Sequence, residues 1–328
     1  YSSVIKEDEL TPRLRKYADV WRTVTGWTDE QLAQQIRRDR IDILIDLTMH
    51  MSDGRPLLFA RKPAPVQICW LAYPGTTGLT AMDYRLTDPY LDPPGQHDDW
   101  YSEKSIRLPE TFWCFNPLTR ELPVNSLPAS NTGTITFGCL NSSRKVTDRT
   151  LKLWSSVLSA VPNSRLLLLS PQGSHRQAVQ EKLNIPSHRL DFVEYQPRDA
   201  YLRQYHRIDI GLDTLPYNGH TTSLDSYWMG VPVVTRIGET VVGRAGWSQL
   251  NNLNLTELAA ETDDRFIQIA KDLAADLPRL TDLRATLRPR MEKSPLMDPQ
   301  RFAKNMESTY RDLWRIWCRA QSPVPGLK

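Results

Sequence analysis

Residues 209–235 carry the feature that most constrains how this chain can fold. A short apolar run (209–213) is followed by turn-forming residues, by a helical segment and, after Gly230, by a Val-rich run. This order is typical of a strand, a turn, a helix and a second strand. It places the start of a helix, at Thr221 and Thr222, at the carboxyl edge of a parallel strand.

A helix start in that position is suited to binding an anion. The first backbone N–H groups of a helix lack internal partners and carry the positive end of its dipole, so a diphosphate is stabilised there. The hydroxyls of Thr221 and Thr222 and the imidazole of His220 would surround these amides, and Gly219 allows close approach because it has no Cβ. Asp225 would repel phosphate, so we expect it to bind sugar hydroxyls of a nucleotide.

A purely structural interpretation of the same residues stays open at this point. The spacing of Thr222 and Asp225 also matches a capping box, in which both side chains satisfy the end of the helix. The motif alone does not separate the two interpretations.

Strand and helix patterns alternate over nearly the whole chain, which predicts parallel sheets covered by helices. In the first part we expect strands at 41–47, 66–71 and 84–87 and helices at 8–24, 28–38 and 57–63. In the second part we expect strands at 135–140, 165–169, 191–195, 209–213 and 231–235 and helices at 148–160, 174–183, 199–206 and 222–229. The predicted fold class is therefore α/β, with two Rossmann-like doubly wound domains facing a cleft.

The predicted domain organisation follows from the breaks in this alternation. Residues 1–115 form an N-terminal half and residues 134–298 a second, nucleotide-binding half, and the Pro-rich segment 116–133 links them. Residues 299–328 are predicted to form a C-terminal helix with an apolar stripe. We expect this stripe to pack into a hydrophobic core, and one place where it could do so is the domain junction. The stripe consists of Phe302, Met306, Tyr310, Leu313 and Trp317.

Composition and charge exclude several classes of protein. The 41 basic and 38 acidic residues are mixed along the chain, so nucleic acid is not expected as a partner. No apolar stretch is long enough to span a bilayer, and no membrane partner is expected. The four cysteines are far apart and form no CxxC pair, which favours a reduced, cytoplasmic protein and no metal site. Tyr1 to Val4 is similar to the tail of a strand, so we expect the chain to continue upstream.

Three further groups of residues are candidates for chemistry. Lys145 follows a predicted strand and precedes a helix, so its ammonium could face the same diphosphate as Thr221. Asp46 ends a buried strand and His50 follows in a loop; they are a candidate acid-base pair, or Asp46 caps the loop amides and His50 lies at the surface. The turn at 73–78 has glycines that permit close approach to a ligand.

These and other motifs together resemble the protein O-GlcNAc transferases, in order and over nearly all of the chain. The segments that carry the resemblance are 63–67, 70–76, 83–84, 87–88, 101–104, 218–222 and 238–240. The resemblance implies a GT-B arrangement, UDP-GlcNAc as donor, Ser/Thr hydroxyls of proteins or peptides as acceptors, inversion at the anomeric carbon, and no metal or other cofactor.

The resemblance also implies roles for individual residues. Lys145 is similar to the lysine that stabilises the leaving diphosphate, and Asp225 to the acid that binds ribose. Ser142 belongs to the same predicted donor site. The diphosphate cradle corresponds to His220, Thr221 and Thr222, the uridine site to Pro197, Arg198 and Tyr201, and the contact with the donor sugar to Pro74.

Departures from the family pattern leave parts of the site open. Tyr217 stands where animal enzymes have Cys near the N-acetyl group, and Arg144 where they have Tyr, so the sugar pocket differs and a bacterial-type homologue is indicated. Arg198 replaces the usual Lys, and Tyr201 a His. The family's His-containing segment and its tetratricopeptide repeats would lie upstream of Tyr1. The general base is therefore not assigned, with Asp46 and His50 as candidates.

Two alternative functions remain. One is a related glycosyltransferase that uses GDP-fucose or UDP-glucose, and the other is a noncatalytic nucleotide-binding scaffold. The SPINDLY-type O-fucosyltransferases share the overall plan but differ around 218–222 and at Asp225, which favours UDP-GlcNAc here. A scaffold would have no need for Lys145 together with the diphosphate cradle.

Overall fold

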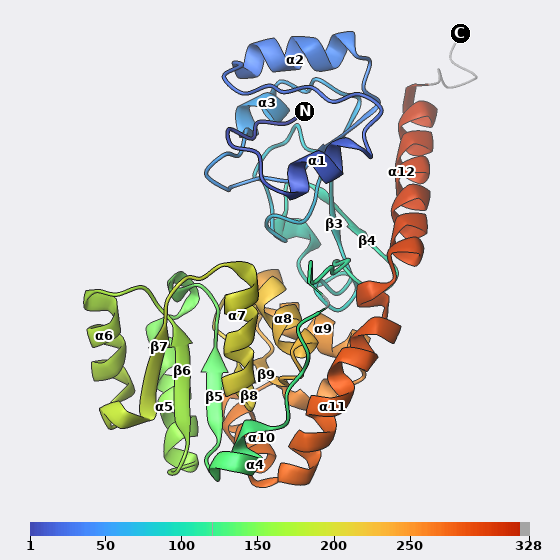
Figure 1. The fold of residues 1–328 in the computed structure, drawn as a ribbon. Coiled ribbons are helices and arrows are strands. Elements are labelled where there is room, and N and C mark those ends of the chain that lie inside the picture. The colour runs from blue at the N-terminus through green and yellow to red at the C-terminus, as the bar shows by residue number, and fades with distance from the viewer. Residues whose placement is uncertain (120, 322–328) are drawn as a thin grey trace. The chain divides into compact units, whose positions relative to one another are not determined.

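Two parallel sheets organise the computed structural model, which describes residues 1–119 and 121–321 (Figure 1). Contacts divide the chain into two units. Unit 1 comprises residues 1–87, 97–107 and those from Met306 onward, and unit 2 comprises residues 88–96 and 108–305. The predicted fold class, α/β with two parallel sheets, is confirmed. The domain boundaries predicted at 115 and 133 stay predictions.

Unit 1 contains a four-stranded parallel sheet in the order β1-β2-β3-β4. Its helices bury apolar side chains against this sheet, among them Leu32 and Ile36 of one helix and Leu58 and Phe59 of another. The elements are β1 (Ile43–Asp46), β2 (Val66–Cys69), β3 (Tyr84–Thr87), β4 (Lys104–Arg107), α1 (Leu10–Arg15), α2 (Asp29–Arg38), α3 (Pro56–Ala60), the 3₁₀ helix η1 (Asp98–Trp100) and the greater part of α12 (Pro299–Gln321).

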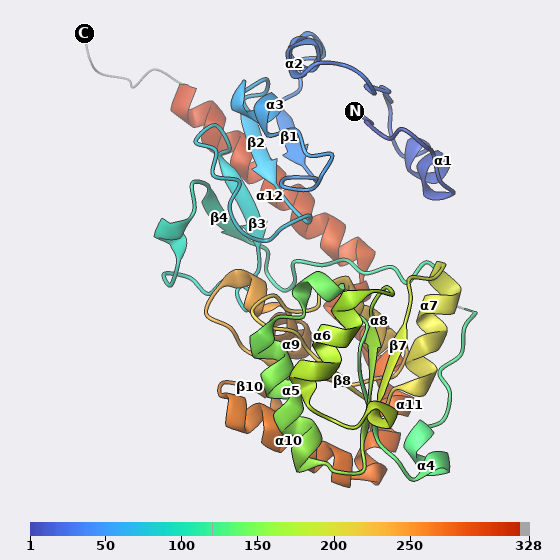
Figure 2. The same cartoon turned by 90° about the vertical axis from the view of Figure 1, so that its left-hand side faces the viewer.

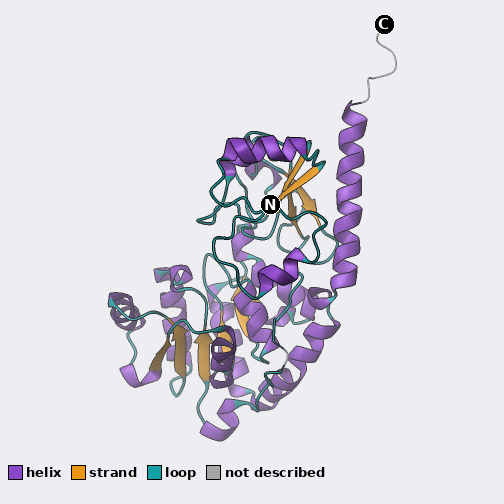
Figure 3. Cartoon of the chain, turned by 45° about the horizontal axis from the view of Figure 1, so that its top comes forward, coloured by secondary structure: helices purple, strands orange, loops and turns teal. Residues whose placement is uncertain are grey.

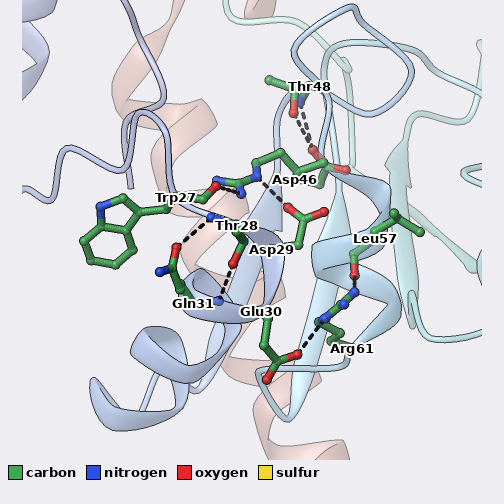
Figure 4. A network of polar contacts seen from close by, with 10 residues as sticks. Trp27, Thr28, Asp29, Glu30, Gln31, Asp46, Thr48, Leu57 and Arg61 are labelled. Carbon is green, nitrogen blue, oxygen red and sulfur yellow. Dashed lines mark hydrogen bonds and ion pairs between the residues drawn. The ribbon is translucent and has the colours of Figure 1, made fainter.

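A capping box starts α2, as the sequence predicts (Figure 4). The Thr28 hydroxyl accepts a hydrogen bond from the amide of Gln31 at 3.2 Å, and the Gln31 side chain accepts one from the amide of Thr28 at 2.9 Å. Two otherwise unpaired amides are thereby satisfied. Three residues of α2, Leu32, Ala33 and Ile36, are then turned into the core.

The helix predicted over residues 8–24 was wrong for most of its length, because α1 ends at Arg15. Ser2 pairs with Thr23 as an isolated parallel bridge, in which Ser2 N donates to Arg22 O and Val24 N donates to Ser2 O, both at 2.8 Å. Such pairing requires extended backbone, so a contact between distant residues overrides the local helical pattern. Two strands, β4 and β10 (Ala259–Ala260), were also missed, and so was a helix inside the predicted linker, α4 (Pro128–Thr132).

Unit 2 contains a six-stranded parallel sheet in the order β10-β9-β8-β5-β6-β7. Figure 2 shows α5, α6 and α10 on one face and α7, α8 and α11 on the other, and Figure 3 shows the strands of each sheet in orange. The strands are β5 (Thr136–Cys139), β6 (Arg165–Leu169), β7 (Leu190–Val193), β8 (Ile210–Leu212), β9 (Val233–Arg236) and β10 (Ala259–Ala260). The helices, besides α4, are α5 (Asp148–Ala160), α6 (Ser174–Leu183), α7 (Arg198–Gln204), α8 (Thr221–Trp228), α9 (Ala245–Leu253), α10 (Asp263–Ala275) and α11 (Leu277–Lys293).

The strand order of unit 2 has a switch point between β5 and β8. From β5 the chain first builds outward through β6 and β7, and then returns to the other side of β5 to build β8, β9 and β10. The loops that follow β5 and β8 therefore leave neighbouring strands toward opposite faces and open a crevice between them. Open α/β sheets bind their ligands at such points.

The C-terminal helix α12 buries its apolar stripe, as the sequence predicts. Phe302 and Met306 are each 8% exposed and Leu313 is 2% exposed, whereas Tyr310 and Trp317, also predicted for the stripe, are only half-buried. Residues 322–328 of the predicted segment 299–328 lie outside the described residues. Of the described helices, none is both long and apolar enough to cross a membrane.

Candidate functional site

The N-terminus of α8 lies at the switch point of unit 2, and the capping-box interpretation of its first turn was wrong. α8 begins at Thr221, with His220 as its N-cap, and among the described residues no side chain caps it. The Thr222 hydroxyl donates instead to Asn141 Oδ1 in the loop after β5, and the carboxylate of Asp225 is bound by Arg198. The first amides of α8 are therefore left for a ligand.

The side chain of His220 has a buried nitrogen, Nε2, without a hydrogen-bond partner among the described residues. The ring packs between Trp113 and Tyr217, at centroid distances of 5.4 and 5.3 Å, and the His220 carbonyl accepts a hydrogen bond from Gln249 Nε2 at 3.1 Å. Burial, and then the charge of Lys145, lower the pKa of His220 to about 3. A neutral imidazole with an unpaired buried nitrogen is a group that a ligand can satisfy.

Lys145 reaches the loop that precedes α8. It ends a 3₁₀ helix, η2 (Ser143–Lys145), and its Nζ donates to Asn218 O at 2.8 Å and lies 3.9 Å from the centroid of the Tyr217 ring. Burial lowers the pKa of Lys145 to about 8, against the opposing effect of the Asp213 charge. The predicted convergence of the two strand ends is thus confirmed: a cation after β5 lies beside the helix start after β8.

Asp213 holds the loop that Lys145 contacts. This carboxylate is 2% exposed and accepts hydrogen bonds from Gly219 N at 2.7 Å, from Thr214 N at 2.9 Å and from Thr235 Oγ1 at 2.7 Å. Burial raises its pKa to about 6. A Cβ on Gly219 would lie 2.2 Å from Ser223 Oγ, so a side chain here would have to displace that hydroxyl.

Arg198 and Asp225 form an ion pair on the adjacent side of α8. Arg198 Nη1 donates to Asp225 Oδ2 at 2.7 Å, and Nη2 donates to Oδ1 of the same carboxylate. Asp225 is 2% exposed, and burial raises its pKa while the Arg198 guanidinium opposes that shift. The sequence predicted both residues as ligand contacts and did not predict that they bind each other.

The remaining predicted residues of unit 2 lie around these groups. The Tyr201 hydroxyl shares a hydrogen bond of 2.9 Å with Tyr205, whose hydroxyl donates to Thr222 O at 2.9 Å. Pro197 is the N-cap of α7, and the carbonyl of Ser142 accepts from Lys145 N at 2.9 Å. Unit 2 thus brings together a hydrogen-bonded set that links the ends of β5 and β8 with the starts of α7 and α8.

In unit 1 the structure separates the contacts of Asp46 from those of His50. Asp46, 3% exposed, accepts from Thr48 N at 2.9 Å, Thr48 Oγ1 at 3.0 Å and Met49 N at 3.0 Å, so it caps the loop (Figure 4). His50 Nε2 instead lies 2.9 Å from Thr76 O, and its exposed ring packs on Tyr73. Within residues 1–119 and 121–321, Asp46 and His50 share no hydrogen bond. Pro74 is buried, and its carbonyl accepts from Arg85 at 2.6 Å.

Sequence reasoning missed three residues that support the site. Asp213 directly follows the buried strand β8, much as Asp46 ends β1, and this placement at a strand end was the available signal. Trp113 and Gln249 contact His220 from distant parts of unit 2. The residues adjacent to them in the sequence form no motif that predicts these contacts. In the described part of the chain, no three His, Cys, Asp or Glu side chains gather as metal ligands.

The pKa of Lys145 predicts how binding of a nucleoside diphosphate such as UDP changes with pH. The bound anion favours the protonated lysine and raises its pKa above the value of about 8 in the free protein. The affinity should therefore be constant below about pH 8 and fall by up to about tenfold per pH unit above it. Calorimetric titration from about pH 7 to about pH 10 measures this slope. His220, with a pKa of about 3, contributes nothing in that range.

A Lys145→Arg variant is the control for this prediction. Arginine stays charged over the whole range because its pKa is above about 12. Its binding should vary little with pH, and equal slopes in the two proteins would contradict the assignment to Lys145.

Comparison with known proteins identifies the family. The model of glycosyl transferase family 41 matches residues 23–117 and 125–306. A probable UDP-N-acetylglucosamine–peptide N-acetylglucosaminyltransferase SPINDLY of Petunia hybrida is 40% identical over 339 residues, covering 100% of this chain and 36% of the relative. The SEC protein of Arabidopsis thaliana, with the same enzyme description, is 30% identical over 327 residues, covering 96% of this chain and 33% of the relative. This chain thus spans about a third of the length of these curated relatives.

A solved structure agrees over almost the whole chain. A mutant of the Thermobaculum terrenum O-GlcNAc transferase superposes with a TM-score of 0.90 and 39% sequence identity, covering 98% of this chain and 62% of that one. The resemblance to O-GlcNAc transferases and the GT-B fold type are thereby confirmed. With the family model matching most of its residues, the chain belongs to glycosyl transferase family 41.

Proposed function

We propose that this chain is the catalytic region of an enzyme that transfers GlcNAc from UDP-GlcNAc to Ser or Thr hydroxyls of proteins, with inversion and without a metal. The observation that carries the proposal is the juxtaposition of Lys145 with the uncapped start of α8 and the unpaired Nε2 of His220. The names of the relatives, which describe UDP-N-acetylglucosamine–peptide N-acetylglucosaminyltransferases, support this donor and this acceptor.

The chemistry of the reaction explains why these groups would be needed. When the bond between the sugar and the diphosphate breaks, negative charge grows on the leaving UDP. Lys145 supplies a full positive charge, and the α8 amides supply the positive end of a helix dipole. His220, neutral because of its lowered pKa, can donate a hydrogen bond without adding charge. Preorganised donors of this kind can neutralise a diphosphate themselves, which supports a metal-independent reaction.

The ion pair of Arg198 and Asp225 would serve the nucleoside. Asp225 presents a carboxylate to ribose hydroxyls, and Arg198 fixes the orientation of that carboxylate through two hydrogen bonds. Tyr201, next to Arg198 on α7, presents an aromatic ring for the uracil base.

Inversion requires an acceptor hydroxyl to attack the anomeric carbon from the face opposite the leaving diphosphate, with one base to take its proton. Of the two candidate bases, Asp46 is committed to the loop at residues 48 and 49, whereas His50 is exposed. We therefore favour His50 over Asp46 as the candidate in this chain.

The proposal is tested with the protein in its full-length form. We expect UDP and UDP-GlcNAc to bind in a calorimeter and GDP not to bind, and we expect GlcNAc to be transferred to a Ser/Thr peptide with a chelator present. NMR of the product should show the inverted anomeric configuration. Preference for GDP would instead indicate the fucosyltransferase alternative, and absence of nucleotide binding would indicate the scaffold.

A further inference from the structure

The loop formed by residues 73–78 of unit 1 is held by a buried carboxylate that the proposed mechanism does not use. Glu103, immediately before β4, is 3% exposed. It accepts hydrogen bonds from Thr77 N at 2.7 Å and from Thr76 Oγ1 at 2.7 Å, and the Thr77 hydroxyl also donates to it. One side chain thus fixes both the backbone and the side chains of two consecutive loop residues.

The contacts of Thr76 extend this support to His50. Thr76 Oγ1 also accepts from Gly78 N at 2.9 Å, so the hydroxyl that Glu103 orients closes the turn. The carbonyl of Thr76 lies 2.9 Å from His50 Nε2. The position of the imidazole therefore depends on a residue that Glu103 holds in place.

A second buried charge fixes the other end of the same loop. Arg85 of β3, 1% exposed, donates from Nη1 to Pro74 O at 2.6 Å, and its guanidinium lies 3.5 Å from the centroid of the Tyr101 ring. Both charges act at the end of β2, where burial, and then the charge of Glu103, raise the pKa of the Cys69 thiol. The loop is thus fixed at Pro74 and again at Thr76 and Thr77.

Buried charges are a costly way to build an ordinary turn. Moving a carboxylate or a guanidinium out of water is strongly unfavourable in proteins, and an ordinary turn needs neither group. Here the loop forms one wall of a pocket of about 560 Å³ lined by His50, Met51, Ala72, Tyr73 and Thr76. Rigid walls and fixed polar groups are what a reacting site requires.

We propose that Glu103 is a positioning residue for glycosyl transfer, which holds Thr76 and Thr77 so that His50 keeps its place at this pocket. The inference rests on the proposed function, because it assigns the pocket to that reaction. Its structural half, that Glu103 fixes the loop, can be measured without any substrate.

The test compares Glu103→Ala and Glu103→Gln in the full-length protein. In Glu103→Ala the amide of Thr77 loses its acceptor, and the amide of Gly78 keeps an acceptor, Thr76 Oγ1, that Glu103 no longer orients. Hydrogen exchange at both amides should therefore accelerate by about 10- to 100-fold, the range expected for losing a hydrogen bond to a charged acceptor. The kcat/KM for GlcNAc transfer should fall by a similar factor. Glu103→Gln keeps an oxygen that can accept from Thr77 N and should restore both quantities to within a few-fold.

Binding of UDP alone separates positioning from general damage. The groups proposed to bind UDP belong to unit 2, so the Kd for UDP should not change in Glu103→Ala. Asp39→Ala is the matched control: Asp39 is another carboxylate of unit 1 with several bonds, to Arg22, Tyr1 and Gln35, and it has no contact with the loop. Asp39→Ala should leave loop exchange and kcat/KM unchanged.

Unchanged exchange at Thr77 and Gly78, or unchanged kcat/KM in Glu103→Ala, would overturn the proposal. Equal losses in Glu103→Ala and Asp39→Ala would also overturn it, because they would indicate general destabilisation. A parent protein that binds UDP but transfers no GlcNAc would contradict the proposed function. It would also contradict the role of Glu103 in glycosyl transfer. The exchange data would still decide whether Glu103 fixes the loop.

Discussion

Replacement of Lys145 by alanine is expected to lower turnover of UDP-GlcNAc by on the order of 10²–10³-fold, the typical loss when one preorganised donor to a developing anion is removed. The lysine reaches the loop that precedes α8, through its bond to Asn218 O. The loss should lie mainly in kcat, because charge on the diphosphate increases as the sugar departs. Steady-state kinetics with a peptide acceptor measure it.

Lys152→Ala is the matched control for this prediction. Lys152 is an exposed lysine of α5, the helix that follows Lys145 in the chain, and its removal should not change turnover. Thermal unfolding of Lys145→Ala should show an intact fold. Turnover within a few-fold of the parent protein would exclude Lys145 from stabilising the leaving group.

Replacement of Asp225 by alanine is expected to weaken UDP binding by about 10- to 100-fold. A hydrogen bond to a charged group contributes about 1.5–3 kcal/mol, and the variant loses the carboxylate proposed to bind ribose. It also leaves the Arg198 guanidinium, 31% exposed, without the partner that orients it. Calorimetry with UDP measures the change, and an Asp225→Asn variant should lose less because it keeps a hydrogen-bonding side chain.

A second carboxylate of unit 2 provides the comparison for Asp225. Asp191 of β7 also binds arginines, Arg165 at 3.0 Å and Arg207 at 3.4 Å, but it lies at the surface. Asp191→Ala should leave the Kd for UDP unchanged. If Asp225→Ala bound UDP as tightly as Asp191→Ala does, the ribose assignment would be wrong.

The core of the candidate site in unit 2 could be predicted because its signals are local. Gly219 and the two threonines at 221 and 222 mark a turn and a helix start, and α8 begins within one residue of the expected position. Lys145 was placed correctly by the rule that parallel strands end at a common edge. Both inferences use a few adjacent residues and one general property of parallel sheets.

The pairing of side chains could not be predicted, because it depends on contacts between distant segments. Arg198 and Asp225 are 27 residues apart and each was expected to face the ligand. The choice between capping and pairing for Asp46 was open in the sequence, and the structure decides it through amides two and three residues ahead. β4 was missed because Lys104–Arg107 has one apolar residue, so its place in the sheet comes from pairing with β3.

The contacts of Lys145 have a consequence for the stability of the protein. A carbonyl oxygen and an aromatic face stabilise its ammonium, and within residues 1–119 and 121–321 no carboxylate forms an ion pair with it. The pKa of Lys145 is lowered to about 8 because the folded protein destabilises the charged ammonium. The lysine therefore lowers the free energy of unfolding below about pH 8. This effect disappears as the pH rises to 10.5, the ordinary pKa of a lysine, because the side chain is then neutral in the unfolded chain as well. Stability and readiness to react are therefore opposed at this position. An apolar residue at this position would remove that unfavourable charge and would also remove the cation proposed to face the leaving group.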